Sequence, residues 1–116
     1  MIEKEIQRAI LDYLAARHIL AFRQNTGAVA SEYKGKKRFM RFGTPGMADV
    51  YCLVKLPCEC GRLCTTIVYI EVKNEKGKQS ELQRFFEQDV TREGAKYIVA
   101  RSVEDVERSL KNLGFT

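Results

Sequence analysis

The sequence predicts an α/β fold in which a mixed sheet is flanked by helices. Three observations support this prediction. Apolar residues recur with helical spacing near both ends of the chain, β-type apolar runs lie between them, and a helical segment separates the last two of these runs. A strand-helix-strand crossover makes two strands parallel, whereas a short connection makes them antiparallel. The sheet is therefore expected to contain both kinds of pairing.

The first half of the chain begins with an amphipathic helix over residues 2–17. Its apolar face is formed by Ile6, Ile10, Tyr13 and Leu14, which recur at helical spacing. Residues 19–23 are predicted as a short strand, and Asn25, Thr26 and Gly27 as a turn. A basic segment, residues 31–42, follows and ends at the Gly-Thr-Pro-Gly stretch 43–46.

The second half predicts a hairpin, a helix, a strand and a last helix. Two apolar runs, residues 49–56 and 65–73, form an antiparallel hairpin with its tip near Cys60. Ser80 and Gln83 have the spacing of a capping box, and the helix that follows ends at Gly94. Its buried stripe is predicted to consist of Leu82, Phe85, Phe86 and Val90. A strand over residues 96–101 precedes a helix capped by Ser102, whose inward residues are Val103, Val106, Leu110 and Leu113.

The register of the hairpin brings two acidic residues together. A turn centred on Cys60 places Asp49 opposite Glu71, and it also pairs Tyr51 with Tyr69 and Val50 with Ile70. One face is then wholly apolar and consists of Val50, Cys52, Val54, Val68, Ile70 and Val72. The other face ends in Asp49, Glu71 and Lys73. Two facing carboxylates repel unless a hard cation such as Mg²⁺ lies between them, so we expect a metal site here.

Each candidate residue also has a simpler interpretation. Glu71 and Lys73 lie on the same side of a strand, where such pairs commonly form surface ion pairs that contribute about 0–1 kcal/mol. Glu3 lies near the apolar face of the first helix, either joining the acidic cluster or extending into solvent at a frayed N-terminus. Gln83 is fully explained by its capping box, although its amide can also reach a lysine or a substrate phosphate.

Length and charge limit the class of protein. The 116 residues are enough for a single domain, 1–116, with its own core. No apolar run approaches the roughly 18–20 residues of a membrane span, and the opening sequence MIEKEIQR lacks an apolar signal region, so we expect a cytoplasmic protein without a membrane partner. The net charge of +5 and the pI of 9.1 favour a polyanionic partner such as nucleic acid.

Four cysteines lie close together in the sequence: Cys52, Cys58, Cys60 and Cys64. This clustering is unlike the spread of cysteines in a secreted disulfide scaffold. A structural zinc ion usually has four ligands, and the single histidine, His18, is remote and is expected at the end of the first helix as a cap. We therefore expect reduced thiols at the hairpin tip, with zinc bound by Cys58, Cys60 and Cys64 as the alternative.

The order of these residues resembles the VRR-NUC family, the virus-type replication and repair nucleases of the PD-(D/E)XK superfamily. The resemblance covers nearly the whole chain. It is carried by Glu3 and Gln7, by the motifs R-x-N-T-G and G-x-P-G-M-x-D, by the E-V-K motif that begins at Glu71, and by Gln83. Ala48 departs from the pattern, because the name of the superfamily leads one to expect a proline before the aspartate.

This resemblance implies a restriction-endonuclease-like αβββαβ core and a Mg²⁺- or Mn²⁺-dependent DNA endonuclease. The implied substrate is branched DNA such as a four-way (Holliday) junction, cut by a homodimer in DNA repair. Asp49 and Glu71 would bind the metal together with the backbone carbonyl of Val72. Lys73 would orient and help to deprotonate the attacking water. Glu3 would act through the water shell of the metal or as an outer ligand, and Gln83 would brace the lysine or the scissile phosphate.

The basic segment is the expected contact with DNA. In SEYKGKKRFMRF, aromatic residues are mixed with Lys34, Lys36, Lys37, Arg38 and Arg41. This mixture suits phosphate contact with some aromatic stacking, and the alternative is a solvated loop with its aromatic residues in the core. Two alternatives apply to the whole chain, namely a non-catalytic DNA-binding or dimerisation module and a small zinc-stapled interaction domain.

Overall fold

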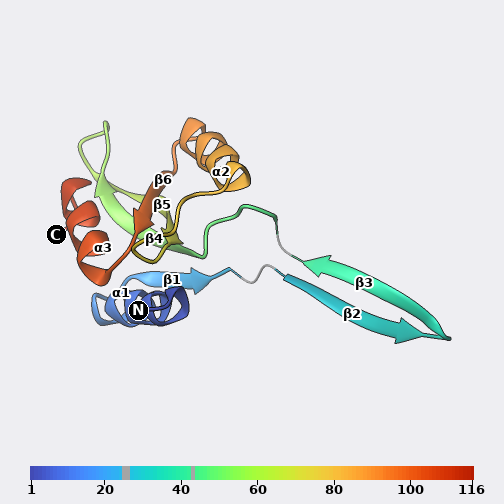
Figure 1. Cartoon of the computed structure of the whole chain (residues 1–116). Helices are drawn as coiled ribbons and strands as arrows, with labels where there is room; N and C mark the ends of the chain where they lie inside the picture. The colour runs from blue at the N-terminus through green and yellow to red at the C-terminus, as the bar shows by residue number, and fades with distance from the viewer. Residues whose placement is uncertain (25–26, 43) are drawn as a thin grey trace.

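The fold is built on a four-stranded mixed sheet with the strand order β1-β4-β5-β6 (Figure 1). The computed structural model describes residues 1–24, 27–42 and 44–116, and it describes 27–33 and 37–42 by their backbone alone. Strand β4 pairs antiparallel with β1 and β5, and β6 pairs parallel with β5. The elements are α1 (Glu3–Ala16), β1 (Leu20–Arg23), β2 (Gly27–Tyr33), β3 (Lys36–Phe42), β4 (Val50–Pro57), β5 (Leu63–Val72), α2 (Glu81–Arg92), β6 (Lys96–Ala100) and α3 (Val103–Asn112). The α/β class, with helices flanking a mixed sheet, is confirmed.

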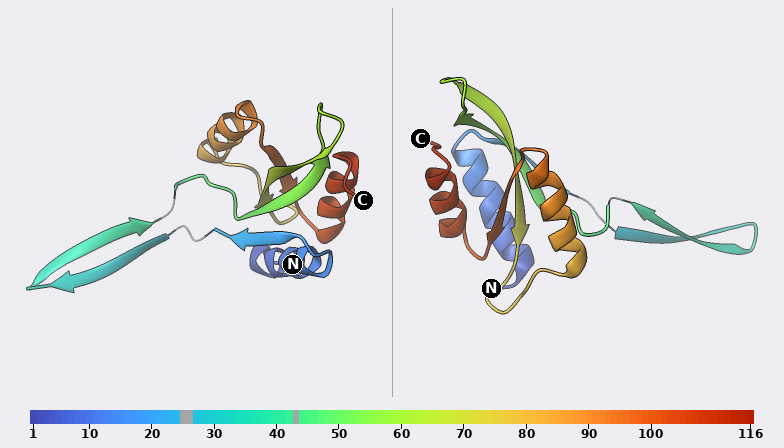
Figure 2. Two further views of the ribbon diagram at one scale, coloured as in Figure 1. Left: turned by 180° about the vertical axis from the view of Figure 1, so that it is seen from behind. Right: turned by 90° about the horizontal axis from the view of Figure 1, so that it is seen from above.

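The apolar face of the β4–β5 hairpin forms the core with two helices. All six residues predicted for this face are at most 1% exposed. Ile6, Ile10 and Leu14 of α1 pack against it together with Val106 and Leu110 of α3, and both helices lie on the same side of the sheet (Figure 2). Removal of this apolar surface from water, at about 25 cal/mol per Å², is the main favourable contribution to folding.

Helix α2 covers the opposite face through aromatic contacts. The rings of Tyr69 and Phe86 meet edge to face, with their centroids 5.0 Å apart, and Phe86 also lies 6.4 Å from Tyr97. The predicted buried stripe is wrong for Leu82 and Phe85, which are 56% and 51% exposed. Phe86 occupies the space over the two tyrosines, so these neighbouring side chains have too little sheet surface beneath them to become buried.

Both predicted serine caps are present. The hydroxyl of Ser80 accepts a hydrogen bond of 3.2 Å from the backbone N–H of Gln83, and the hydroxyl of Ser102 accepts one of 3.2 Å from that of Asp105. These bonds satisfy N–H groups that a helix start leaves without partners. His18 directly follows the end of α1 with a φ of 58°, in the left-handed conformation common just after a helix.

The tip of the β4–β5 hairpin lies near Cys60, as predicted. The backbone N–H of Gly61 donates to the carbonyl of Cys58, and Gly61 has a φ of 81°. The expectation of reduced thiols is wrong for two of the cysteines, because Cys58 and Cys64 form a disulfide bond. The turn brings their Cα atoms within 6.0 Å, which is inside the range that a disulfide can span.

A separate two-stranded sheet, formed by β2 and β3, projects away from the rest of the molecule and is called the arm below (Figures 1 and 2). The sequence predicts no strand within residues 31–42, and the antiparallel pairing of β2 with β3 corrects this. Lys34 and Gly35 form the turn between them, with φ values of 51° and 76°, as a two-residue hairpin turn requires. The arm contributes to a molecular length of 60 Å, against 32 and 27 Å in the other directions.

The arm begins and ends where two strands of the main sheet are already paired. Arg23 of β1 pairs with Val50 of β4, and the backbone N–H of Gln24 donates a hydrogen bond of 2.7 Å to the carbonyl of Asp49. Of the predicted turn at residues 25–27, Asn25 and Thr26 lie outside the described residues, and Gly27 begins β2.

Across the described ranges 1–24, 27–42 and 44–116, the structure contains no helix with the length and apolar character needed to span a membrane.

Candidate metal centre

The hairpin register places Asp49 beside Glu71, as the sequence predicts. Val50 pairs with Ile70 and Tyr51 with Tyr69, so the residue before β4 reaches the level of Glu71. Oδ2 of Asp49 accepts a hydrogen bond of 2.8 Å from the backbone N–H of Val72. This bond fixes the direction of the aspartate side chain.

Glu71 is the one charged residue among the buried side chains of the described residues, and it is only 1% exposed. Burial is the main reason that the pKa of Glu71 rises from 4.5 to about 9. A side-chain hydrogen bond with Asp49 and the charge of Asp49 raise it further, whereas the ammonium group of Lys73 lowers it. Among the residues that the structure describes, no group donates a hydrogen bond to Oε1 of Glu71. A buried anion of this kind requires either a proton or a cation.

Lys73 completes the group directly after the end of β5. Its Nζ lies 3.9 Å from Oε2 of Glu71, and the two side chains are 12% and 2% exposed. An ion pair on an exposed strand does not describe this arrangement, because β5 lies between β4 and β6 in the sheet. The amine is held close to the carboxylate pair and is largely shielded from solvent.

Glu3 lies near this group but outside the pair. Its side chain is exposed at the start of α1, and its negative charge contributes to the raised pKa of Glu71. The three carboxylates of Glu3, Asp49 and Glu71 do not come within 4.8 Å of one another as a set. This position fits an outer role, through water, better than direct coordination beside the other two.

Gln83 is occupied by the capping box. Its side-chain oxygen accepts a hydrogen bond of 2.8 Å from the backbone N–H of Ser80, and the backbone N–H of Gln83 donates to the hydroxyl of Ser80. Both of these contacts are local to the start of α2. The structure therefore supports the simpler interpretation of Gln83 and does not bring it into contact with Lys73.

A tight loop after β5 lies close to the side chains of Glu3 and Lys73, and the sequence interpretation missed it. Oδ1 of Asn74 accepts hydrogen bonds from the backbone N–H groups of Lys76 (3.0 Å) and Gly77 (2.7 Å). Arg101, which lies between β6 and α3, donates hydrogen bonds to the carbonyls of Asn74 and Gly77. A Cβ at Gly77 would lie 3.2 Å from both Oε1 of Glu3 and Cδ of Lys73, which shows how closely they approach this glycine. The N-x-x-G pattern of such turns is the signal that could have revealed this loop.

The basic residues of the predicted DNA contact lie on the arm. Lys34 lies in its turn and Lys36 begins β3. Lys37, Arg38 and Arg41 follow in β3, where the side chains are outside the described structure. The arm projects away from the sheet (Figure 1), so its tip does not join the acidic group. Any DNA that contacts both must extend along the molecule.

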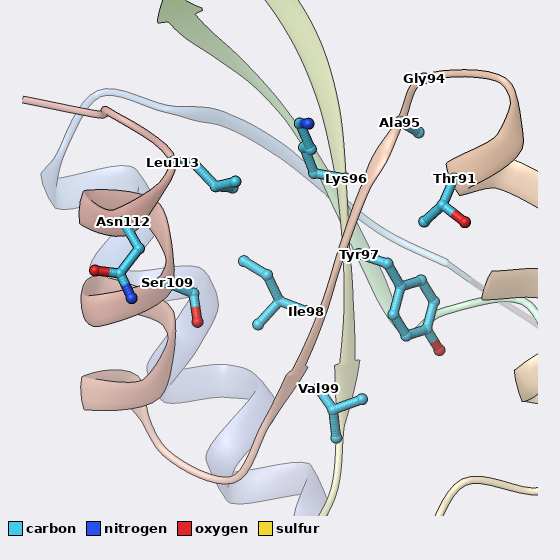
Figure 3. A pocket seen from close by; sticks show the side chains of 10 residues that line it. All are labelled: Thr91, Gly94, Ala95, Lys96, Tyr97, Ile98, Val99, Ser109, Asn112 and Leu113. Carbon is cyan, nitrogen blue, oxygen red and sulfur yellow. The ribbon is translucent and has the colours of Figure 1, made fainter. Parts of the chain in front are cut away.

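A hollow of about 520 Å³ lies elsewhere, between α2, β6 and α3 (Figure 3). Ile98 and Ser109 line it, Tyr97 borders it, and Lys96 is the only charged residue among its lining residues. It contains no carboxylate and no thiol, so it offers no set of metal ligands.

The donor set of Asp49 and Glu71 fits a hard divalent cation. Both residues offer carboxylate oxygens, which Mg²⁺ and Mn²⁺ prefer, and Oε1 of Glu71 is buried without a donor among the described residues. The carbonyl of Val72 belongs to the same strand end, next to the N–H that holds Asp49.

Comparisons of the chain with protein-family models, with curated proteins and with solved structures found no match.

Proposed function

We propose that the protein is a Mg²⁺- or Mn²⁺-dependent DNA endonuclease that hydrolyses phosphodiester bonds. The observation that carries this proposal is the buried carboxylate of Glu71, which lies beside Asp49 and has an Oε1 without a donor among the described residues. A fold that needed only a stable strand would place an apolar residue here, because burial of an uncompensated carboxylate costs free energy. A bound cation offsets that cost.

In this proposal Asp49 and Glu71 hold the ion together with the carbonyl of Val72. When bound, such an ion stabilises negative charge on the phosphoryl oxygens and lowers the pKa of a coordinated water. The hydrogen bond from Val72 keeps Asp49 in place at 2.8 Å. Lys73 orients the attacking water and helps to deprotonate it, and Glu3 acts from the solvent side through water.

The DNA contact in this proposal combines the arm with the acidic centre. The chain has a net charge of +5, and the arm extends well beyond the sheet (Figure 2). Phosphate contacts from such an extension fix the position of a duplex without reading its sequence. The resemblance to VRR-NUC nucleases, which rests on sequence motifs alone, extends the proposal to branched DNA such as four-way junctions and to a homodimer that presents one centre to each of two strands.

The direct test measures cleavage of labelled four-way junction, flap and linear duplex, with and without Mg²⁺ or Mn²⁺. We expect metal-dependent cleavage that is lost in Glu71→Gln and retained in Glu75→Gln, a matched substitution at an exposed glutamate nearby. Cleavage of linear duplex alone would reject the branched substrate while keeping the chemistry. Absence of cleavage in every substrate and metal would reject the nuclease.

A second candidate is a non-catalytic DNA-binding module of the same fold. The raised pKa of Glu71 favours it, since a value of about 9 keeps this residue protonated near neutral pH when no cation is bound. Glu71 and Asp49 could then form a permanent hydrogen-bonded pair. This candidate predicts DNA binding that does not change when Mg²⁺ or Mn²⁺ is added, whereas the nuclease requires ion binding at this pair.

A further inference from the structure

The tip of the β4–β5 hairpin carries three cysteines that converge on one point. The Sγ atoms of Cys58, Cys60 and Cys64 all lie within 4.8 Å of one another. Cys58 and Cys64 are joined as a disulfide, whereas Cys60 is an exposed free thiol with its Sγ 3.5 Å from that of Cys64. Apolar packing does not account for this convergence, because Cys60 is exposed and the other two are only partly buried.

The backbone of the tip holds the sulfur atoms together independently of the disulfide. The N–H of Cys58 donates to the carbonyl of Arg62 at 3.0 Å, and the N–H of Gly61 donates to the carbonyl of Cys58 at 3.0 Å. Cys64 lies in β5, where it pairs with Leu56 of β4. After reduction of the disulfide, these contacts keep all three thiols at one end of a rigid hairpin.

We propose that the reduced tip binds one thiophilic divalent ion of the zinc class through Cys58, Cys60 and Cys64. Zinc binds thiolates at about 2.3 Å in a tetrahedral arrangement, which separates its sulfur ligands by about 3.8 Å. The three sulfur atoms already lie within 4.8 Å of one another, so small side-chain movements suffice. Three protein ligands leave the fourth position open for water or an exogenous ligand.

The site forms in two balanced steps. A dithiol reductant transfers two electrons and two protons to the Cys58–Cys64 disulfide, which yields two thiols and the oxidised dithiol. The metal ion then displaces one proton from each of the three thiols, and three thiolates with one divalent ion leave a net charge of −1. Oxidation of Cys58 and Cys64 removes two ligands, so the redox state of the tip controls metal occupancy.

This site is separate from the acidic centre. Cys64 and Glu71 lie seven residues apart on the same strand, which corresponds to roughly 23 Å at the rise of an extended chain. The proposal therefore does not depend on nuclease activity, and a metal ion at the tip would serve structure or the binding of a fourth ligand.

The test uses the full chain, reduced and kept anaerobic, with Co²⁺ as a spectroscopic substitute for zinc. We expect one thiolate-bound Co²⁺ per chain, counted from the thiolate-to-cobalt charge-transfer band, together with the visible bands of tetrahedral cobalt and displacement of this Co²⁺ by Zn²⁺. Oxygen ligands at Asp49 and Glu71 give no thiolate band, so the signal reports the tip alone. The oxidised protein is expected to show no such band.

Variants identify the ligands. Cys60→Ser should weaken Co²⁺ binding by more than about tenfold. Mutation of a residue that only hydrogen-bonds to a metal ligand already lowers metal affinity by about tenfold or more, and Cys60 is proposed as a ligand itself. Cys52→Ala is the control, since this thiol is fully buried and burial raises its pKa to about 12. Glu59→Gln tests the neighbouring carboxylate as the fourth ligand, and the proposal predicts no change. A reduced protein without the charge-transfer band, or a Cys60→Ser variant that binds as tightly as wild type, would overturn the proposal.

Discussion

The backbone N–H of Val72 donates a hydrogen bond of 2.8 Å to Oδ2 of Asp49. This bond connects the residue before β4 to the end of β5, so the two acidic side chains are held at neighbouring positions by the sheet itself. A carboxylate that already accepts a backbone bond has little rotational freedom left to lose on ion binding. In the proposed metal site, this bond would reduce the side-chain entropy that Asp49 loses when an ion binds.

The buried Glu71 makes the stability of the metal-free protein depend on pH. Its pKa rises from 4.5 to about 9 on folding. At a pH between these two values, Glu71 is protonated in the folded state and ionised in the unfolded state. The contribution of Glu71 to the free energy of unfolding is complete below its pKa in the unfolded state. This contribution decreases as the pH rises toward its pKa in the folded state, by up to about 1.4 kcal/mol per pH unit. We expect a loss on the order of 3 kcal/mol between about pH 5 and pH 8, measured by urea unfolding in a chelator.

Glu71→Gln should remove most of this dependence, because an amide has no proton to lose in that range. Glu75→Gln should keep the wild-type slope, since Glu75 is exposed. If Glu71→Gln shows the same slope as wild type, another group is responsible and Glu71 is ionised in the fold.

Ion binding should release protons. A raised pKa of about 9 means that a cation must displace the proton of Glu71 near neutral pH. Calorimetric titration with Mn²⁺ in two buffers of different ionisation enthalpy should show about one proton released per ion near pH 7. The apparent affinity should rise with pH until Glu71 is fully ionised. Binding with the same observed enthalpy in both buffers would place the ion elsewhere.

Lys73→Ala should abolish most cleavage while ion binding persists. In the proposed mechanism Lys73 acts on the attacking water, and removal of a general acid or base typically costs about 10²–10⁴ in rate. Because Lys73 lowers the pKa of Glu71, its loss should also shift ion binding to higher pH. Single-turnover cleavage at saturating Mn²⁺ separates the two effects. Lys76→Ala, at an exposed lysine of the adjoining loop, is the matched control and should cleave normally.

Gly46→Ala should destabilise the fold strongly. Gly46 has a φ of 82°, and a Cβ there would lie 2.5 Å from the backbone carbonyl oxygen of Leu82 in α2. The left-handed conformation and the overlap with backbone together should cost about 3 kcal/mol. Gly61→Ala is the control, because Gly61 also has a positive φ but has open space around it, and about 1 kcal/mol is expected. Chemical unfolding of both variants measures the difference, and equal losses would mean that the contact with α2 yields easily.

The arm should supply part of the salt dependence of DNA binding. Replacement of Lys36, Lys37 and Arg38 by alanine should weaken binding, and the slope of log K against log salt should fall by about 0.9 for each phosphate that the variant no longer neutralises. The control replaces three exposed basic residues of the helices, Arg92, Arg108 and Lys111. Fluorescence anisotropy over a salt series provides both slopes. Equal slopes for the arm variant and wild type would exclude the arm from the DNA interface.

Much of the fold follows from local patterns in the sequence. A turn centred on Cys60 predicted the hairpin register correctly, since Val50 pairs with Ile70, and serine followed by a helical pattern located both caps. The depth of Glu71 was not predictable in this way, because it depends on β6 pairing along the far side of β5 after a crossover. The proximity of Cys58 and Cys64 likewise depends on the tip geometry rather than on spacing.

The missed elements have physical reasons as well. Residues 27–42 lack the regular alternation that predicts a half-buried strand, so the pairing of β2 with β3 in a sheet of their own could not be read from that pattern. The exposure of Leu82 and Phe85 reflects the same limit, since a helical pattern shows which side of a helix is apolar but not how much sheet lies beneath it.

The segment that contains the arm leaves the main sheet after Gln24 and returns to it at Asp49. These two residues are joined by a hydrogen bond from the N–H of Gln24 to the carbonyl of Asp49. Because Gln24 and Asp49 are hydrogen-bonded neighbours, a shorter connection between them would leave the strand order of the main sheet unaltered. Evolution can therefore lengthen, shorten or exchange this appendage independently of the sheet. If the proposed function holds, changes confined to the arm would alter DNA contacts while Asp49 and Glu71 stay in place.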